Sequence, residues 1–451
     1  MDILTTLLGT GGLLWTVAFF IIALAIIVFV HEYGHYIVGR WSGIHAEVFS
    51  LGFGPVLYSG TDKRGTRWQI AAVPLGGYVK FLGDADAASS GADAAAMAGL
   101  SAEERRHTMA GAPLWARAAT VAAGPIFNFI LAIAVYWGLI LWTGIATERP
   151  VVGSLATLPG MAATLQPGDE VLALNGKPTP DLETYLKTAR DLPAAALVSY
   201  HIRRAGAEID VSAPHPMPPL VSSVQLKSAA IAAGLEAGDV ILSAGGTPVT
   251  AFAELPPIVE GLAGAPVPLT VWRADGSAKG RVFDITITPN RRDIPKDGGG
   301  FETRWLIGLS GGLIFDPEVR RAGPVEALGL AVDRSWFAAT TSLSGLWHVV
   351  AGEISSCNIS GPIGMAQVMG QAATQGADYF ITMLAVMSLG IGLINLFPIP
   401  VLDGGHLVFH AYEAVFRRPP PERVLRVLMT LGLTIILLFM AYALTNDVTC
   451  S

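Results

Sequence analysis

The feature that most constrains this chain is an apolar run that ends in a pair of histidines. The run spans Leu13 to Val30, carries no charge, and is followed directly by His31, Glu32, Tyr33, Gly34 and His35. About 20 apolar residues allow a helix to cross the hydrocarbon core of a bilayer. On such a helix, positions i and i+4 share one face, so the two imidazoles can bind one metal ion. Glu32 lies beside them and can take a proton from water that the metal activates.

Composition favours a membrane protein and argues against nucleic-acid binding. The 451 residues are 52% hydrophobic and only 14% charged, with a mean hydropathy of +0.51, which is too apolar for an ordinary soluble protein. The net charge of -7 and the lack of a long basic run exclude a typical nucleic-acid partner. The two cysteines, Cys357 and Cys450, are too few for a disulfide framework or a thiolate zinc site. We expect them to be free, with a single bridge as the alternative in an oxidising compartment.

Four stretches are apolar and long enough to span a bilayer: Leu13–Val30, Ala118–Ala146, Tyr379–Leu402 and Val427–Leu444. The first is not followed by a small-residue cleavage site, so we expect a retained span. Lys and Arg gather in 36–117 and in 417–426, whereas 1–12 and 445–451 contain none. Because short basic flanks stay in the cytoplasm, both termini and the long segment 149–378 are expected outside. The histidine pair then lies towards the cytoplasmic end of the first span.

The segments between the spans suggest several local structures. Residues 45–82 are rich in β-branched and aromatic residues broken by Gly and Pro, which predicts strands beside the histidine pair. A free strand edge there can bind an extended substrate, and a purely structural hairpin is the alternative. Residues 84–100 read as a small-residue linker. Residues 324–353 predict an amphipathic helix that either lies on the membrane or covers a soluble unit.

The outer segment contains an internal repeat. LQPGDEVLALNGKPT begins at Leu165 and LEAGDVILSAGGTPV begins at Leu235, so the Gly-Asp pairs match at an offset of 70. Repetition at a fixed offset indicates two copies of one supersecondary unit. We expect two small α/β units, the first over 150–218 and the second over 219–291.

A third metal ligand is needed, because catalytic zinc sites normally take three protein ligands and leave one position to water. The best candidate is Asp403, which follows the third span in NLFPIPVLDGG, residues 395–405. Pro398 and Pro400 break the helix there, and irregular backbone at membrane depth is tolerated only inside protein or beside a wet cavity. His406 is a weaker alternative ligand. The donor set suits zinc, although other divalent ions bind such sites.

Two asparagines within the spans receive different interpretations. Asn395 shares a segment with Asp403, so we expect it to donate to substrate or to an oxyanion. Asn128 is expected to tie the second span to its neighbours. A purely structural role for His31 and His35 is the alternative to metal binding, but ionisable residues clustered at membrane depth favour function.

Taken in order, these motifs resemble those of one protein family. HEYGH, LGFGP, PLGGYVKFLG, the paired outer unit, SGPIGMAQ and NLFPIPVLDGG follow one another as in the bacterial site-2 proteases, which are M50-type intramembrane zinc metalloproteases. The resemblance covers nearly the whole chain. It implies that His31, His35 and Asp403 bind Zn²⁺, that Glu32 is the catalytic base and that Asn395 helps to hold substrate. It also implies that the repeats are PDZ domains.

The expected architecture is an α-helical membrane protein with four transmembrane helices, a membrane-associated β-segment on the cytoplasmic side and two periplasmic α/β PDZ domains. In chain order, the expected parts are 1–36, the first transmembrane helix; 37–117, the β region and linker; 118–147, the second transmembrane helix; 150–218 and 219–291, the PDZ domains; 292–377, an amphipathic helical region; 378–416, the third transmembrane helix; and 425–445, the fourth.

The expected function is cleavage of transmembrane segments of single-pass proteins at the bacterial inner membrane, as in regulated intramembrane proteolysis. The resemblance implies substrates such as a pre-trimmed anti-sigma factor, and a protein embedded in the lipid bilayer with no nucleic-acid partner. A second hypothesis makes remnant signal peptides the main substrate. A third is a PDZ scaffold with a structural metal, which Glu32 argues against because a structural site needs no base. A transporter is disfavoured because the spans show no repeat.

Overall fold

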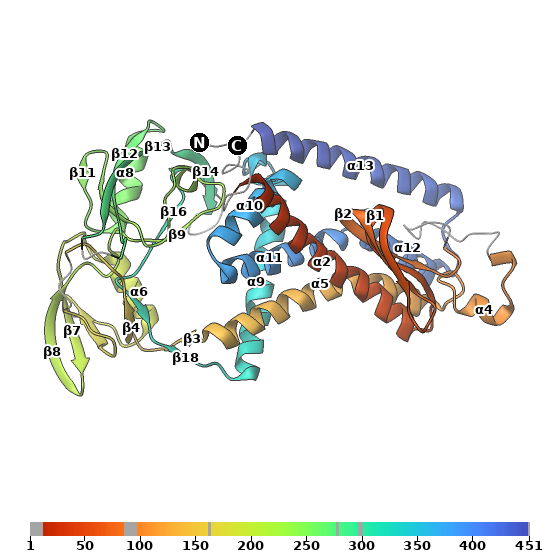
Figure 1. The fold of residues 1–451 in the computed structure, drawn as a ribbon, viewed down its shortest axis with the longest axis horizontal. Coiled ribbons are helices and arrows are strands. Elements are labelled where there is room, and N and C mark those ends of the chain that lie inside the picture. Colours follow the sequence, from red (N-terminus) through yellow and green to blue (C-terminus); the bar gives the residue numbers. More distant parts are fainter. Residues whose placement is uncertain (1–11, 85–96, 161–163, 277–278, 296–300, 450–451) are drawn as a thin grey trace. The chain divides into compact units, whose positions relative to one another are not determined.

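The computed structural model describes residues 12–84, 97–160, 164–276, 279–295 and 301–449 (Figure 1). The chain divides into two compact units. Unit 1 combines the parts of 1–139, 325–350 and 356–451, and unit 2 combines 140–324 with 351–355. Most of the linker predicted over 84–100 lies outside the described residues.

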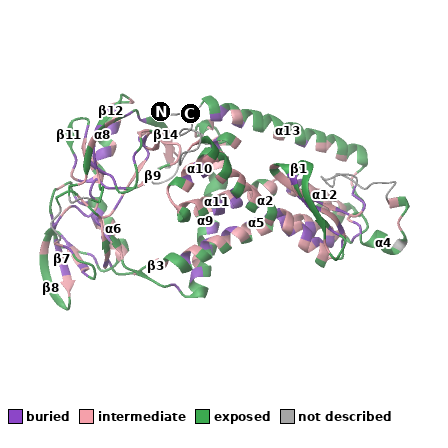
Figure 2. Cartoon of the chain, viewed as in Figure 1, coloured by how far each residue is buried: buried purple, intermediate pink, exposed green. Residues whose placement is uncertain are grey.

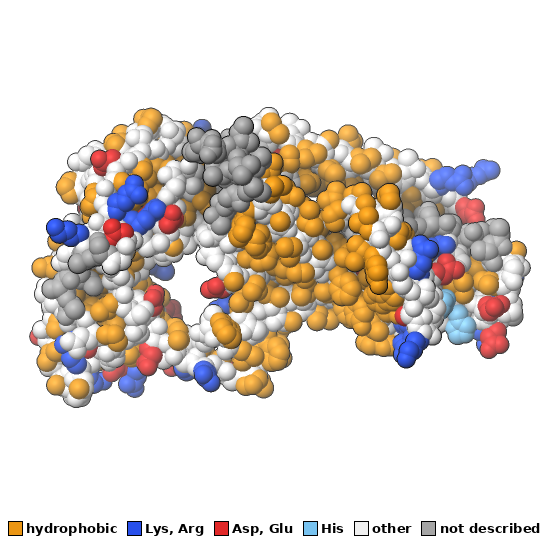
Figure 3. Space-filling model, in the orientation of Figure 1, with side chains coloured by type: hydrophobic (Ala, Val, Ile, Leu, Met, Phe, Trp, Pro, Cys, Tyr) orange, Lys and Arg blue, Asp and Glu red, His pale blue; other side chains and the backbone are white. Residues whose placement is uncertain are grey.

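Unit 1 contains the helices that are long and apolar enough to cross a membrane. Within the described chain there are four: α2 (Leu13–Trp41), α5 (Leu114–Thr143), α11 (Ala377–Asn395) and α13 (Glu422–Thr449). This confirms the four predicted spans as helices. Many residues of these helices are exposed (Figure 2), and large apolar side chains are among them (Figure 3), as lipid-facing helices require. The first helix runs through both histidines and ends at Trp41, well beyond the apolar run.

The third predicted span, 378–416, is not one helix. Helix α11 ends at Asn395, and a separate helix, α12 (Asp403–Phe416), begins after a non-helical stretch that contains Pro398 and Pro400. The bounds 378–416 were therefore wrong for one helix, because these two prolines lack the amide donors that a continuous helix needs. The helix break expected from the prolines is confirmed. Upstream, α10 (Pro362–Thr374) begins at Pro362, as SGPIGMAQ predicted.

The predicted strands after the first span are present. Strands β1 (Ala46–Thr61) and β2 (Arg67–Phe81) pair antiparallel and pack against α2 through Phe49 and Trp68. Residues 48–51 pair with 67–70 on one side and with 77–80 on the other. The end of β2, residues 77–81, is therefore an edge strand. The short helix α4 (Ala102–Arg106) follows, capped at its start by Ser101.

Unit 2 confirms the internal repeat. Its two four-stranded sheets have the same order, β6-β5-β7-β8 and β11-β10-β12-β13. The first copy comprises β5 (Glu170–Leu174), β6 (Lys177–Pro178), α6 (Leu182–Asp191), β7 (Val198–Arg204) and β8 (Ala207–Ala213). The second comprises α7 (Ala229–Ala232), β10 (Val240–Ala244), β11 (Thr247–Pro248), η1 (Phe252–Glu254), α8 (Leu255–Gly261), β12 (Val267–Arg273) and β13 (Arg281–Ile287).

The repeated Gly-Asp pairs have a structural explanation. The first copy's Asp169 is buried and accepts two hydrogen bonds from Arg204, both at 2.7 Å. The second copy's Asp239 is bound in the same way by Arg273, at 2.6 and 2.8 Å. A carboxylate this deeply buried is stable only with such a partner. The motif therefore marks a structural ion pair in each copy.

Further short strands pair in unit 2, and three of these pairs join an early strand to one from a later part of the chain. The antiparallel pairs are β3 (Ile145–Ala146) with β18 (Val319–Arg320), β4 (Val152–Leu155) with β17 (Phe315–Pro317), β9 (Val221–Val224) with β16 (Leu309–Gly311), and β14 (Asn290–Pro295) with β15 (Phe301–Leu306). The second copy is thus nested inside the first.

The helical region predicted over 292–377 was wrong for its first part, since helix α9 begins only at Pro324 and ends at Val350.

One cysteine expectation is corrected. Cys357, which follows α9 in the turn η2 (Ser356–Asn358), is disulfide-bonded rather than free. Cys450 lies outside the described residues. A structural disulfide is typical of an oxidising compartment.

Candidate metal centre

Two candidate ligand nitrogen atoms come from α2. His31 and His35 lie one turn apart on the buried side of the helix, with ring centroids 4.8 Å apart. Their Nε2 atoms approach to 3.2 Å. The spacing seen in the sequence therefore places both imidazoles at one point, as i and i+4 positions of a helix should.

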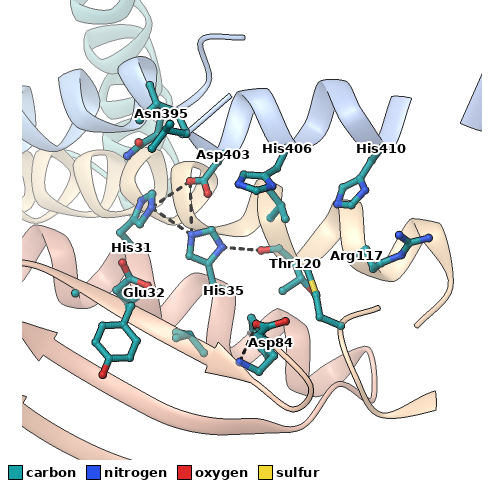
Figure 4. Close-up of a pocket in the computed structure, with 18 of the residues that line it drawn as sticks. His31, Glu32, His35, Asp84, Arg117, Thr120, Asn395, Asp403, His406 and His410 are labelled. Carbon is teal, nitrogen blue, oxygen red and sulfur yellow. Dashed lines mark hydrogen bonds and ion pairs between the residues drawn. The ribbon is translucent and has the colours of Figure 1, made fainter. Parts of the chain in front are cut away.

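The third atom comes from the start of α12. The Oδ2 atom of Asp403 lies 3.2 Å from Nε2 of His31 and 3.5 Å from Nε2 of His35 (Figure 4). All three candidate ligand atoms lie within 4.8 Å of one another. The following residues, Gly404 and Gly405, press against the backbone of the preceding turn, where a Cβ atom would clash with carbonyl oxygens. Glycine at both positions lets α12 begin close to the broken segment and brings the carboxylate to the histidines.

Helix α5 supports the two imidazoles without supplying a ligand. The carbonyl oxygen of Thr120 lies 2.8 Å from Nδ1 of His35, and the side-chain amide of Asn128 lies 3.2 Å from Nδ1 of His31. Between them, Gly124 faces both rings, and a Cβ atom there would lie 2.8 Å from Cε1 of His31. Asn128 thus contacts the site directly, in addition to accepting a hydrogen bond from Ser388 of α11 at its backbone oxygen.

These supports determine which nitrogen of each ring can bind a cation. A carbonyl oxygen only accepts, so Nδ1 of His35 donates to Thr120 and Nε2 keeps its lone pair. Oδ1 of Asn128 is buried with no hydrogen-bond partner among the described residues. Placing Oδ1 towards His31 satisfies that oxygen through Nδ1–H, because the network decides which amide atom faces the ring. Nε2 of His31 then keeps its lone pair as well.

The three converging atoms fit a metal ion. Oδ2 of Asp403 is buried and finds no hydrogen-bond donor in the described part of the chain. It faces two nitrogen lone pairs, so three electron-rich atoms point at one another. A cation among them removes that repulsion, and two imidazoles with one carboxylate are a normal catalytic zinc set.

The remaining predicted residues line the same cavity, which has a volume of about 370 Å³. Glu32, Asn395 and His406 are among its wall residues, together with the edge strand of β2 at 77–79 and Phe81. The Glu32 carboxylate also interacts with the backbone amide of Val79. His406 lies near the candidate metal-binding group but is not one of the three converging residues.

Several wall residues were not anticipated from the sequence. Thr120, Asp84, Arg117 and His410 line the cavity, and His410 follows His406 by one turn along α12 (Figure 4). Thr120 acts through its backbone, so no side-chain pattern could reveal it. Gly124 and Asn128 left a usable signal, a glycine and an amide one turn apart in an apolar helix. The expectation that Asn128 serves helix packing alone was incomplete.

Comparison with known proteins gives one consistent family. The model of peptidase family M50 matches residues 19–439. The regulator of sigma-E protease RseP of Salmonella typhimurium is 35% identical over 467 residues, covering 97% of this chain and 99% of the relative. RseP of Escherichia coli is 34% identical, covering 96% and 98%. The "Putative zinc metalloprotease" of Agrobacterium fabrum is 36% identical, covering 98% of both chains.

Proposed function

Because this chain belongs to peptidase family M50 and is a zinc metalloprotease of the site-2 protease type, we propose that it cuts its substrates at the cavity beside His31, His35 and Asp403. These three residues hold the zinc ion. The observation that carries the proposal is the convergence of their lone pairs in a cavity that also contains Glu32. A structural metal site would need neither the cavity nor the additional carboxylate.

Glu32 is the general base of the proposed reaction. A zinc ion held by His31, His35 and Asp403 would supply Lewis-acid chemistry, which polarises a peptide carbonyl and makes water more acidic. The Glu32 carboxylate accepts a proton from the attacking water and returns it to the leaving amine. Its position next to His31 on α2 keeps it within the same cavity.

The substrate is a membrane-spanning segment that must first be unwound. A transmembrane helix closes its backbone hydrogen bonds internally, which shields its carbonyls from attack. The edge strand 77–81 offers backbone groups that can pair with an unwound substrate, and it borders the cavity. Asn395, at the end of α11, donates to the substrate backbone from the side of α12. The edge strand and Asn395 together hold the substrate extended while it is cut.

The proposed topology puts the cavity near the cytoplasmic face of the inner membrane. Basic residues gather in 36–117 and 417–426, which the positive-inside rule places in the cytoplasm. Both termini and unit 2 are then periplasmic. The disulfide at Cys357 supports this placement, because disulfides persist in the oxidising periplasm and not in the cytosol.

The two copies in unit 2 are PDZ domains in this proposal, acting either as a peptide receptor or as a size filter. The chain enters and leaves them through one strand pair, in which the Thr147 amide donates to the Glu318 carbonyl at 2.9 Å. Residues 148–317 can therefore be replaced by a short glycine turn without stretching the chain. Cleavage of untrimmed substrates by this variant indicates a filter, and loss of all cleavage indicates a receptor.

Single-span proteins of the inner membrane are the proposed substrates. Two relatives are named for regulating sigma-E, so an anti-sigma factor already shortened by another protease is one candidate, and remnant signal peptides are another. Co-expression of tagged single-span proteins with wild type or with Glu32→Gln reports activity and substrate class together. We expect the variant to keep its zinc and cleave nothing. If Glu32→Gln cleaves at the normal rate, Glu32 is not the general base. If the chain binds zinc but the wild type cleaves none of the tagged proteins, the hypothesis of a scaffold with a structural metal is favoured.

A further inference from the structure

An ion pair links α5 to α12 at the wall of the cavity. The Nη1 and Nη2 atoms of Arg117 donate to the two carboxylate oxygens of Glu413 at 3.0 and 2.7 Å. The two residues are 296 positions apart in sequence, and their side chains are only 17% and 19% exposed. A third donor, Nε of Arg117, binds the carbonyl of Ala112 at 3.2 Å. All three nitrogen atoms of the Arg117 guanidinium therefore donate hydrogen bonds, which fixes its orientation.

Helix α12 needs an anchor of this kind. It does not continue α11, because the stretch from 396 to 402 that joins them is not helical. Its buried residues, among those described, are Gly404 and Gly405, and its other side chains are half-buried or exposed. Glycines contribute little apolar burial, so side-chain packing fixes the position of α12 weakly. Glu413 lies ten residues after Asp403 on this helix, and both of its carboxylate oxygens are bound by Arg117.

The other end of the pair lies on the helix that orients the histidines. Arg117 precedes Thr120 by three residues, and Gly124 and Asn128 follow at further turns of α5. These positions share one face of the helix. The same face thus sets the orientation of His35 and His31 and binds Glu413.

We propose that Arg117 and Glu413 are positioning residues that set the distance between Asp403 and the two histidines. The inference rests on the proposed ligand role of these three residues. A bidentate pair fixes both separation and rotation, which a single contact does not. In a partly buried place the pair also resists water and salt. Without it, the close glycine contacts hold only the first turn of α12, so the helix can turn or slide and move the carboxylate from the point where the two Nε2 atoms meet.

The test measures zinc affinity in the purified full chain in lipid nanodiscs. Wild type, Arg117→Glu, Glu413→Arg and the double exchange are titrated with a chelator, and cobalt replaces zinc for visible absorption spectra. We expect each single reversal to weaken zinc binding by about 10- to 100-fold, the range seen for groups that orient metal ligands. The double exchange restores the pair and should recover the affinity and the cobalt spectrum. Recovery in the double exchange shows that the pair, and not either side chain alone, is responsible, and the cobalt spectrum reports whether the ligand geometry returns with it.

A milder matched pair of variants covers the case in which a reversal fails to fold. Glu413→Gln removes the charge but keeps the shape, and Asp169→Asn does the same to the Arg204 pair of unit 2, at 2.7 Å. We expect Glu413→Gln to weaken zinc binding and change the cobalt spectrum, and Asp169→Asn to leave both unchanged. Wild-type zinc affinity in Glu413→Gln, or equal losses in both, would overturn the proposal.

Asp403→Asn separates this inference from the proposed function. Loss of zinc in Asp403→Asn with full retention in the Arg117 and Glu413 variants refutes the anchor and leaves the ligand set intact. Full retention of zinc in Asp403→Asn refutes the ligand set itself.

Discussion

Replacing Gly124 with alanine should remove the metal while leaving the helices in place. A Cβ atom at this position would come closest to Nε2 of His35, and it would lie 2.5 Å from Cε1 of His35 and 2.8 Å from Cε1 of His31. Ordinary contact begins at 3.4 Å, so the His35 ring must retreat by at least about 0.9 Å. Metal–ligand distances tolerate only about 0.2 Å. The required shift is several times larger than a zinc site can absorb.

The alternative, a separation of α2 and α5, is resisted by their close packing. Gly34 of α2 faces the backbone of Ala123, where an added Cβ atom would lie 2.6 Å from the carbonyl oxygen. Moving the helices apart would break this contact and the hydrogen bond between Asn128 and His31. Turning the two imidazole rings costs less free energy. Overpacking costs about 1–3 kcal/mol, and alanine returns up to about 1 kcal/mol of helix propensity. We therefore expect a loss of stability below about 2 kcal/mol.

The assay compares zinc content, chelator competition and thermal unfolding of the purified chain. Gly138→Ala is the matched control, because it changes the same residue type on the same helix and nothing lies within 4 Å of the added atom. It should keep its zinc and unfold at or above the wild-type temperature. Gly124→Ala should lose zinc by at least tenfold in affinity while unfolding near the same temperature as metal-free wild type. Wild-type zinc affinity in Gly124→Ala would show that the rings are not the groups that yield.

The other expected outcomes concern the ligands and the substrate. If Asp403 is the direct ligand that we propose, Asp403→Asn removes the charge of that ligand and should weaken zinc binding by more than about 100-fold, beyond the range for a supporting group. His406→Asn should leave zinc affinity unchanged; equal effects in chelator titrations would contradict the assignment. Asn395→Ala should keep its zinc but lower kcat/KM for a single-span substrate about five- to tenfold, the effect of one hydrogen bond, and zinc loss would place Asn395 in the metal site instead. In β2, the amide of Val79 faces Glu32, and alternation along an antiparallel strand turns the amide of Tyr78 towards β1. Val79→Pro should therefore abolish cleavage with the β-sheet retained, whereas Tyr78→Pro should disrupt the sheet, as limited proteolysis of β1 and β2 would show.

The parts of the fold that could be predicted from the sequence are those with strong local signals. Long apolar runs gave the four helices, and the i, i+4 spacing placed His31 and His35 together. The prolines before Asp403 correctly announced a helix break, and the 70-residue offset revealed the two copies in unit 2. Each of these signals lies within one short segment, so no knowledge of distant contacts was needed.

The parts that were missed depend on contacts between distant segments. The closing strands β16 and β17 are only three residues long, too short to show a pattern, and they pair with strands more than 80 positions earlier. The nesting of one copy inside the other was therefore invisible. The ion pair at Arg117 was missed for the same reason, since a partner far along the chain leaves no local mark.

Helix α5 shows most clearly why the metal centre could be found but not fully described from its motifs. The motifs name groups that bind or react, whereas α5 supplies a carbonyl, an amide and the space left by a glycine. A carbonyl is present at every residue, and an absent side chain has no chemistry to recognise. Yet these features decide which nitrogen of each imidazole is free and how closely the rings approach. The proposed site is therefore a property of three helices, α2, α5 and α12, and any one of them can disable it without losing a ligand.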